Sequence, residues 1–234
     1  SEKSLNPNKF NIANAEYYSA VSSLYSQAKD ADIEVERFVV KNHEHPKAKL
    51  IFNDLAKSFF NKGDYAGAIK YFEKALDNRQ DNLDTYEIRY QLALAYYQLK
   101  DLKNALREFD YVKGTVAPNA LNAAYYSAVI NFQNENYDLA IIDLKRVENV
   151  NPYKTEVPNW IAQILYRQKK YDELLAYAEP IIANPNGRKI DELCLLTAEV
   201  HFFENNFEKA AAFYEKFKGF RRGTISDQVT FRHA

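Results

Sequence analysis

The chain has little of what metal sites, disulfides and catalytic loops are built from. Its 234 residues include one Cys, no Met, one Trp, six Gly and seven Pro. The lone Cys194 excludes an intrachain disulfide, and together with four His it leaves little material for a zinc site. No apolar run approaches the roughly 18 to 20 residues that cross a bilayer. For this reason we expect no membrane span. Basic and acidic residues balance at 31 against 32, so we expect no nucleic-acid partner either.

Motifs of catalysis are also missing. The sequence has no G-x-S-x-G, no phosphate-binding glycine loop and no H-E-x-x-H. The segment from His43 to Pro46 is the only hint of metal chemistry, and we interpret it as a solvated loop that ends at Pro46. Cys194 and His201 fall on one helical face, where packing explains both. The chain is therefore expected to have no catalytic residue, no cofactor and no metal.

Aromatic residues, in contrast, are abundant, with 18 Tyr and 15 Phe, and they recur with a period. Five segments repeat the same order of small, aromatic and turn residues, each around a lead alanine: Ala56, Ala93, Ala128, Ala162 and Ala198. Their separations are 37, 35, 34 and 36 residues. Twelve residues after each lead alanine comes a second small or aliphatic residue: Ala68, Ala105, Ala140, Leu174 and Ala210. A fixed period of this length is typical of a repeat protein.

Each repeat contains a polar break followed by a large side chain. The break is exemplified by Lys62, Gly63 and Asp64, and the large residues that follow are Tyr65, Leu102, Tyr137, Tyr171 and Phe207. This order predicts a helix, a tight turn and a second helix. The small residues allow the two helices to approach closely, and the large residue fills the corner beneath the turn.

This pattern resembles the tetratricopeptide repeat, a helix-turn-helix unit of 34 residues. In the first repeat, the residues that match the main positions of this pattern are Leu55, Ala56, Phe59, Ala68, Phe72 and Ala75. The resemblance implies an all-α fold, a right-handed superhelical α-solenoid of stacked antiparallel helix pairs. The fourth repeat departs from the pattern, because Leu174 replaces Ala and Pro180 is expected to bend or shorten the second helix. In the fifth repeat, His201 takes an aromatic position.

We divide the chain by these repeats. Residues 1–48 are interpreted as a degenerate N-terminal helical repeat, and residues 219–234 as the start of a truncated sixth repeat. Between them lie five units, at residues 49–82, 86–119, 121–154, 155–188 and 191–218. The last residues, from Val229 to Ala234, align with Ile88 to Ala93, so we expect a fragment of a longer multi-repeat protein. The unfinished helix would leave an apolar edge through which two copies could associate.

In this family the first helices line a concave groove that usually holds the ligand. With the lead alanine counted as position eight, positions two, five, nine, twelve and thirteen face this groove. The expected protein-binding residues are Asn53, Lys57, Phe60, Tyr90, Leu94, Tyr97, Tyr125, Phe132, Asn159 and Tyr166. Aromatic rings and Asn amides suit a protein ligand, although position twelve is often aromatic for packing alone. The cations with which some relatives hold a C-terminal carboxylate are missing from the second and third repeats.

The sequence therefore predicts a non-catalytic scaffold or adaptor that binds a partner peptide or domain in its groove. Two alternatives stay open: a glycan-capture protein of the outer membrane, and the docking arm of an enzyme or sensor whose catalytic domain lies outside this fragment. The style of the sequence is similar to that of bacterial envelope proteins with many such repeats. We accordingly expect a periplasmic or outer-membrane-associated protein, with the cytoplasm as the alternative.

Overall fold

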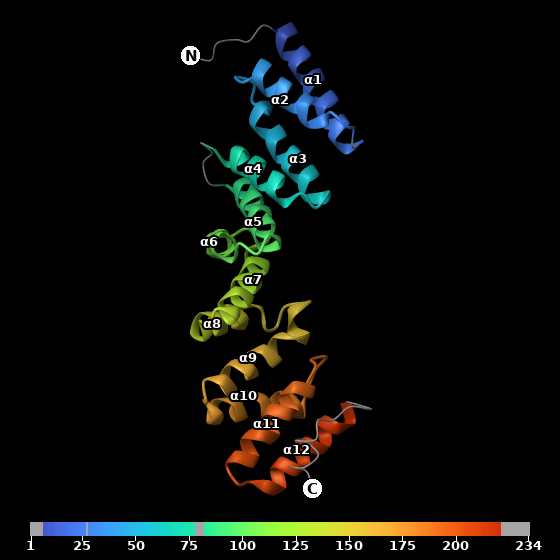
Figure 1. The fold of residues 1–234 in the computed structure, drawn as a ribbon. Helices are drawn as coiled ribbons and strands as arrows, with labels where there is room; N and C mark the ends of the chain where they lie inside the picture. Colours follow the sequence, from blue (N-terminus) through green and yellow to red (C-terminus); the bar gives the residue numbers. More distant parts are fainter. Residues whose placement is uncertain (1–6, 27, 78–81, 221–234) are drawn as a thin grey trace. The chain divides into compact units, whose positions relative to one another are not determined.

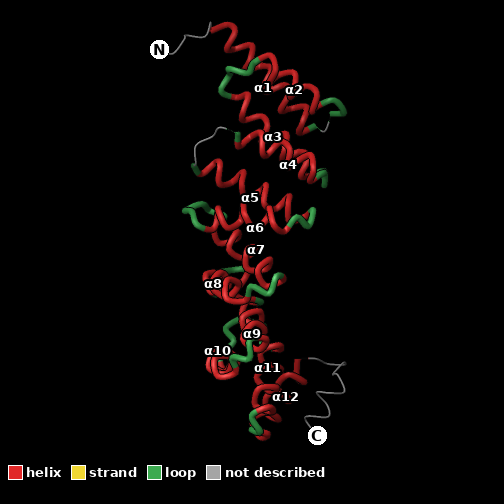
Figure 2. Tube along the Cα trace, turned by 60° about the vertical axis from the view of Figure 1, so that its left-hand side comes forward, coloured by secondary structure: helices red, strands yellow, loops and turns green. Residues whose placement is uncertain are grey.

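The structure is a computed structural model that describes residues 7–26, 28–77 and 82–220. These residues form twelve α-helices, one short 3-10 turn and no strand (Figure 1). Short loops connect most of the helices (Figure 2). The chain divides into two compact units, residues 1–123 and 124–234. The all-α fold expected from the repeat is thus confirmed, whereas most of the expected sixth repeat, from residue 221 onward, lies outside the described residues.

Unit 1 consists of three helix pairs and the first residues of a seventh helix. The pairs are α1 (Pro7–Tyr25) with α2 (Ala31–Lys41), α3 (Lys47–Asn61) with α4 (Tyr65–Leu76), and α5 (Leu83–Gln98) with α6 (Leu102–Lys113). Within the unit α1 also packs against α3, and α4 packs against α5. Each pair therefore buries its apolar faces both internally and against the next pair.

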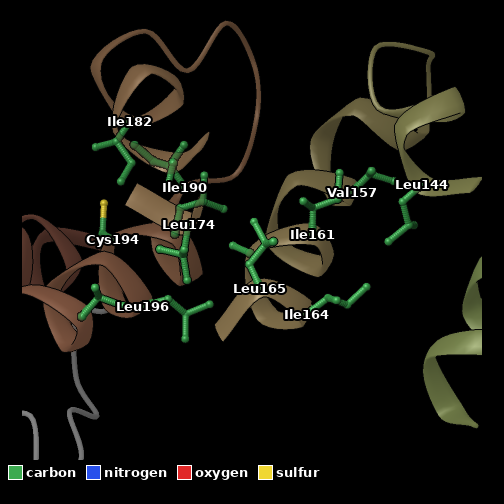
Figure 3. Packing of buried hydrophobic residues seen from close by; sticks show 14 of the residues in the cluster. Leu144, Val157, Ile161, Ile164, Leu165, Leu174, Ile182, Ile190, Cys194 and Leu196 are labelled. Atoms are coloured by element: carbon green, nitrogen blue, oxygen red, sulfur yellow. The ribbon is translucent and has the colours of Figure 1, made fainter. Parts of the chain in front are cut away.

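Unit 2 contains most of α7 (Ala120–Gln133) and the remaining helices. These are α8 (Tyr137–Val147), the 3-10 turn (Tyr153–Thr155), α9 (Val157–Arg167), α10 (Tyr171–Ala183), α11 (Asp191–Phe203) and α12 (Phe207–Phe220). Branched aliphatic side chains fill the core between successive helices (Figure 3). Leu174 of α10 and Ile161 of α9 are fully buried in this core, as is Cys194 of α11.

The small residues of the repeat lie where two helices meet. All five lead alanines are 0% exposed, and the residues twelve positions later are at most 2% exposed. In repeat four, the larger Leu174 is also 0% exposed, so the fold accommodates it in the interior. These positions exclude bulky polar side chains, because a larger group would push the paired helices apart.

The turns between paired helices share one backbone conformation. The residue seven positions after each lead alanine has a positive φ: Gly63 80°, Lys100 62°, Glu135 60°, Lys169 57° and Asn205 63°. Each of these residues donates its N–H to a carbonyl of the preceding helix, as Gly63 does to Phe60 at 3.0 Å. Left-handed backbone is favourable for glycine and strained for other L-residues, so four of the five turns carry this strain.

Two expectations need correction. Pro180 does not shorten its helix, because α10 runs to Ala183 with Pro180 exposed near its C-terminal end. The segment from His43 to Pro46 is not wholly solvated, since His45 is only 7% exposed. The His45 ring packs on Phe10 with 4.7 Å between centroids.

The His45 ring also helps to start the third helix. The backbone N–H of Lys47 donates to Nδ1 of His45 at 3.2 Å, and the buried Nε2 has no partner among the described residues. Burial lowers the pKa of His45, and the Lys47 charge lowers it further. Protonation would place a second N–H against the Lys47 donor, so the neutral ring is the form that fits.

A glycine substitution tests the turn conformation. Gly63→Ala should lower the free energy of unfolding by about 1 kcal/mol, because an added Cβ meets no atom within 4 Å and only the positive φ penalises it. Gly114→Ala is the matched control, because Gly114 has a φ of −80° and an ordinary 3.5 Å contact for the new Cβ. The control should be neutral or stabilising in urea unfolding. An equal loss of unfolding free energy in both variants would contradict the explanation by the positive φ of Gly63.

Acid should weaken the structure through His45. The pKa of His45 is lowered in the folded state from an ordinary value of 6.5, so the unfolded chain takes up a proton first as the pH falls. Stability is thus retained above pH 6.5 and decreases below it, by at most about 1.4 kcal/mol per pH unit for one proton.

Urea unfolding at pH values on either side of 6.5 measures this effect. In His45→Asn, whose amide oxygen can still accept from Lys47, the dependence on pH in this window should shrink. His43→Asn changes an exposed histidine of the same loop and should leave the wild-type dependence in place. An unchanged slope in His45→Asn would exclude this ring as the source.

Candidate functional site

The exposed faces of the first helices are the candidate binding surface in each unit. Within unit 1, α1 and α3 pack side by side, and within unit 2, α9 and α11 do so. Residues at the expected groove positions of these helices are mostly half-buried, so part of each side chain is open to solvent.

The rings at position twelve take part in packing at the turn. Four of them contact the ring that begins the second helix of the same repeat, among them Phe202 of the fifth repeat, whose ring centroid lies 5.6 Å from that of Phe207. The distance between centroids is 5.2 Å for Phe60 and Tyr65, 5.9 Å for Phe132 and Tyr137, and 5.9 Å for Tyr166 and Tyr171. The corresponding Tyr97 is followed by Leu102 instead, and the Lys100 ammonium lies 5.5 Å from its ring centre. Packing at the turn thus explains why position twelve is aromatic.

Both tyrosines expected at position five have aromatic neighbours. Tyr90 meets the buried Phe109 of α6 edgewise, with 6.0 Å between centroids. Tyr125 stacks on Tyr153 of the 3-10 turn, with 4.4 Å between centroids and 24° between planes. Since Tyr153 covers one face of Tyr125, less of this ring is available to a ligand than the sequence implied. Tyr90 keeps its half-buried place on α5.

Two expected polar residues direct their acceptors inward. Asn159 is 8% exposed, and its Oδ1 is buried with no partner among the described residues. The Oδ1 of Asn53 is likewise buried and without a partner there, although the residue as a whole is half-buried. A ligand could not reach these oxygens without a rearrangement. Asn159 therefore lies inside unit 2 and not on an open wall.

One expected residue, Lys57, lines a pocket between α1 and α3. Leu24 and Tyr25 form the α1 side of this pocket. The α3 side consists of Asp54, Lys57, Ser58 and Asn61, and Lys62 follows at the end of the helix. We call these seven residues the α1–α3 pocket. Its volume is about 100 Å³.

Asp54 is the acidic group of the α1–α3 pocket. Its Oδ2 accepts a hydrogen bond of 3.2 Å from the hydroxyl of Tyr17 on α1. Burial raises the pKa of this carboxyl, while the Tyr17 hydrogen bond and the Lys57 charge lower it. Burial and the nearby Asp54 also raise the pKa of Tyr17 to about 12, so this phenol stays protonated and remains a donor near neutral pH. The contact ties α1 to α3 and partly engages the carboxylate.

The sequence reasoning named only Lys57 among these seven residues. Asn61 follows Lys57 at four residues, and Lys62 follows Ser58 at four residues, so these side chains form two adjacent rows near the C-terminal end of α3. That spacing is visible in the sequence and could have identified the two rows. The α1 side could not be assigned in the same way, because the degenerate first repeat offers no clear register for Leu24 and Tyr25.

Two other reactive side chains, those of Cys194 and His201, are buried. Cys194 is 0% exposed, and burial raises the pKa of its thiol to about 11, so it is a buried hydrophobe near neutral pH. His201 is 2% exposed, stacks on Phe213 and places Nε2 2.9 Å from Oε1 of Glu179. No group of three or more His, Cys, Asp or Glu within the described residues is arranged to hold a metal.

A helix that crosses a bilayer must be both long and apolar. None of the described helices combines the length and the apolar character needed to cross a membrane.

Comparison with known proteins identifies the repeat. The sequence model of the tetratricopeptide repeat family matches residues 53–115. The ancillary SecYEG translocon subunit of Haemophilus influenzae is 29% identical over 102 residues, which cover 44% of this chain and 50% of that protein. The chain thus spans about half the length of this relative.

Solved structures agree in fold. YrrB, described as a tetratricopeptide repeat protein with an unusual peptide-binding site, aligns with a TM-score of 0.61 at 16% identity, over 84% of this chain and 95% of YrrB. MamA aligns with a TM-score of 0.59 at 18% identity, over 78% of this chain and 96% of MamA. The matched repeats, the buried small residues and the shared fold lead to one conclusion: residues 53–115 match the tetratricopeptide repeat, and the described residues have the fold of tetratricopeptide repeat structures.

Proposed function

We propose that this chain is a non-catalytic scaffold that holds a segment of a partner protein against the first helices of its repeats. The fold is in general one of protein interaction, and YrrB is described as having a peptide-binding site. The function of the whole protein is part of this proposal, since the chain spans about half of the translocon subunit that it resembles.

The observation that carries this proposal is a stripe on α5 in unit 1. Tyr90, Leu94 and Tyr97 follow one another at four and three residues, so they share one face of the helix. All three are half-buried, which leaves apolar and aromatic surface open beside the packed core. Aromatic side chains of this kind supply much contact area at low cost in conformational entropy, as protein-binding surfaces require.

The cell envelope is the compartment that we propose, and a protein-export or assembly complex is the setting. Support comes from the relative in Haemophilus influenzae, a subunit of a translocon, and from the style of the sequence. A cytoplasmic location is the alternative. Association of two copies through residues 225–234 would involve a segment outside the described residues, so this expectation gains no support from the fold.

A glycan ligand has less support than a protein ligand. The single Trp160 is half-buried and meets Phe132 edgewise at 5.0 Å between centroids, so its ring is used in packing. The docking arm of an enzyme or sensor is compatible with the same first-helix surface, and the partner segment would then belong to the substrate or regulator.

Leu94→Asp tests the α5 stripe. Tyr90 and Tyr125 have packing roles, so their replacement would mix lost binding with lost stability, whereas Leu94 is a half-buried side chain on the proposed surface. The new charge should remove the retention of partner proteins in affinity capture from separate soluble and envelope fractions, because an apolar contact would have to bury it.

Val40→Asp is the matched control, since Val40 is 78% exposed on α2, a second helix. Circular dichroism must show that both variants are folded. Retention of the same proteins by wild type and Val40→Asp, with loss in Leu94→Asp, supports the proposal. Equal retention by all three places the contact elsewhere, and no retention by the wild type favours the glycan alternative or the missing-domain alternative.

A further inference from the structure

The α1–α3 pocket has several donors with no hydrogen-bond or ion-pair partner among the described residues. Neither the Lys57 nor the Lys62 ammonium forms an ion pair with any described residue, and the side chains of Ser58 and Asn61 form no hydrogen bond with one. Elsewhere in unit 1, lysines at helix ends do find acids, as Lys41 does with Glu16. Two ammonium groups, a hydroxyl and an amide are therefore gathered around one hollow, where the Lys57 charge acts on Asp54 without forming an ion pair.

The charge of the hollow favours an anion. Asp54 is its only acidic residue, and the Tyr17 hydroxyl already donates to that carboxylate. Two lysines against one partly engaged carboxylate leave an excess of positive charge and of donors. An incoming carboxylate accepts several hydrogen bonds, and bonds of this kind to charged groups are stronger than neutral ones.

The size and position of the pocket limit what the anion is attached to. A volume of about 100 Å³ has room for several waters, and so for a carboxylate with one or two methylene groups. A C-terminal residue would have to bring its own side chain and amide into the same space. Leu24, 4% exposed, provides an apolar wall for the methylene groups of an acidic side chain.

We propose that the α1–α3 pocket binds an Asp or Glu side chain from the partner segment that lies on the first helices of unit 1. This inference rests on the proposed function and adds a chemical requirement to it: the partner segment carries an acidic residue where it passes between α1 and α3. Lys57 and Lys62 pair with the carboxylate, and Ser58 and Asn61 donate to it. The Tyr17–Asp54 bond holds the two helices at the spacing that forms the pocket.

A peptide selection tests the two proposals separately. The purified chain is used to select from a random peptide library. Selected sequences are synthesised with a fluorescent label for anisotropy measurements, each once with an amidated C-terminus and once with a free C-terminus. Affinity is measured for the wild type, for Lys57→Gln/Lys62→Gln, and for Lys29→Gln/Lys103→Gln. The last variant removes the same charge from exposed positions of unit 1 outside the pocket. Each peptide is also made with its acidic residues changed one at a time to the amide.

We expect a shared acidic position among the selected peptides. Lys57→Gln/Lys62→Gln should weaken binding about tenfold or more, as the loss of charged hydrogen bonds implies, while the control pair leaves it nearly unchanged. Changing the acidic residue to its amide should weaken wild-type binding similarly and have little further effect on the pocket variant. Such non-additivity is the signature of a direct contact.

Three other results would contradict the proposal that the α1–α3 pocket binds an acidic side chain. If peptides bind but neither substitution in the pocket nor amidation of the acidic side chain matters, the pocket is wrong and the scaffold function stands. If only peptides with a free C-terminus bind through Lys57 and Lys62, the pocket recognises a chain end. If inorganic phosphate alone binds there and peptides do not compete, its ligand is a free anion. Failure to select any peptide contradicts the scaffold proposal itself.

Discussion

The close approach of paired helices at small residues is the constraint on which the rest of the structure depends. Ala56 and Ala68 in the first regular repeat, like the alanines at these positions in the others, have no room for a larger side chain without separating the helices. Once these contacts are fixed, the register of each pair is fixed as well. The large residue after the turn then falls against the position-twelve ring, as Tyr65 does against Phe60. The remaining faces of the first helices are left to solvent, and these are the faces available to a partner.

Tyrosine hydroxyls add a polar component to this packing. Tyr71 donates to Glu36 at 2.9 Å and Tyr96 donates to Glu73 at 2.7 Å, and both contacts join neighbouring helix pairs within unit 1. Burial, together with the accepting carboxylate, raises the pKa of Tyr71 to about 12 and raises that of Tyr96 as well. The phenols therefore remain protonated donors near neutral pH. An apolar ring with one polar tip fills the space between repeats and satisfies a carboxylate at its edge.

The helices and the core were predictable from the sequence because the same pattern of small and aromatic residues occurs in five repeats. Ala128 and Ala140 are fully buried for the same reason as Ala56, so one correct register locates every helix pair. Features that depend on residues without a counterpart in the other repeats were not predictable. Tyr125 is covered by Tyr153, which lies in a 3-10 turn between helices. His45 packs against Phe10 of α1, the first helix of the degenerate repeat. Periodicity gives no information about such contacts, because each occurs once.

The same reasoning explains why the α1–α3 pocket lies beside the degenerate first repeat, where the sequence departs most from the repeat pattern. In a regular array, every first helix meets a similar neighbour, and its polar side chains are selected to suit that neighbour. The first helix here departs from the pattern, and it meets α3 through Leu24, Tyr25 and the Tyr17–Asp54 hydrogen bond. This contact leaves a small hollow next to Lys57 instead of a filled interface. A binding pocket requires such a local departure from close packing, whereas the repeated positions are the ones that packing has already used.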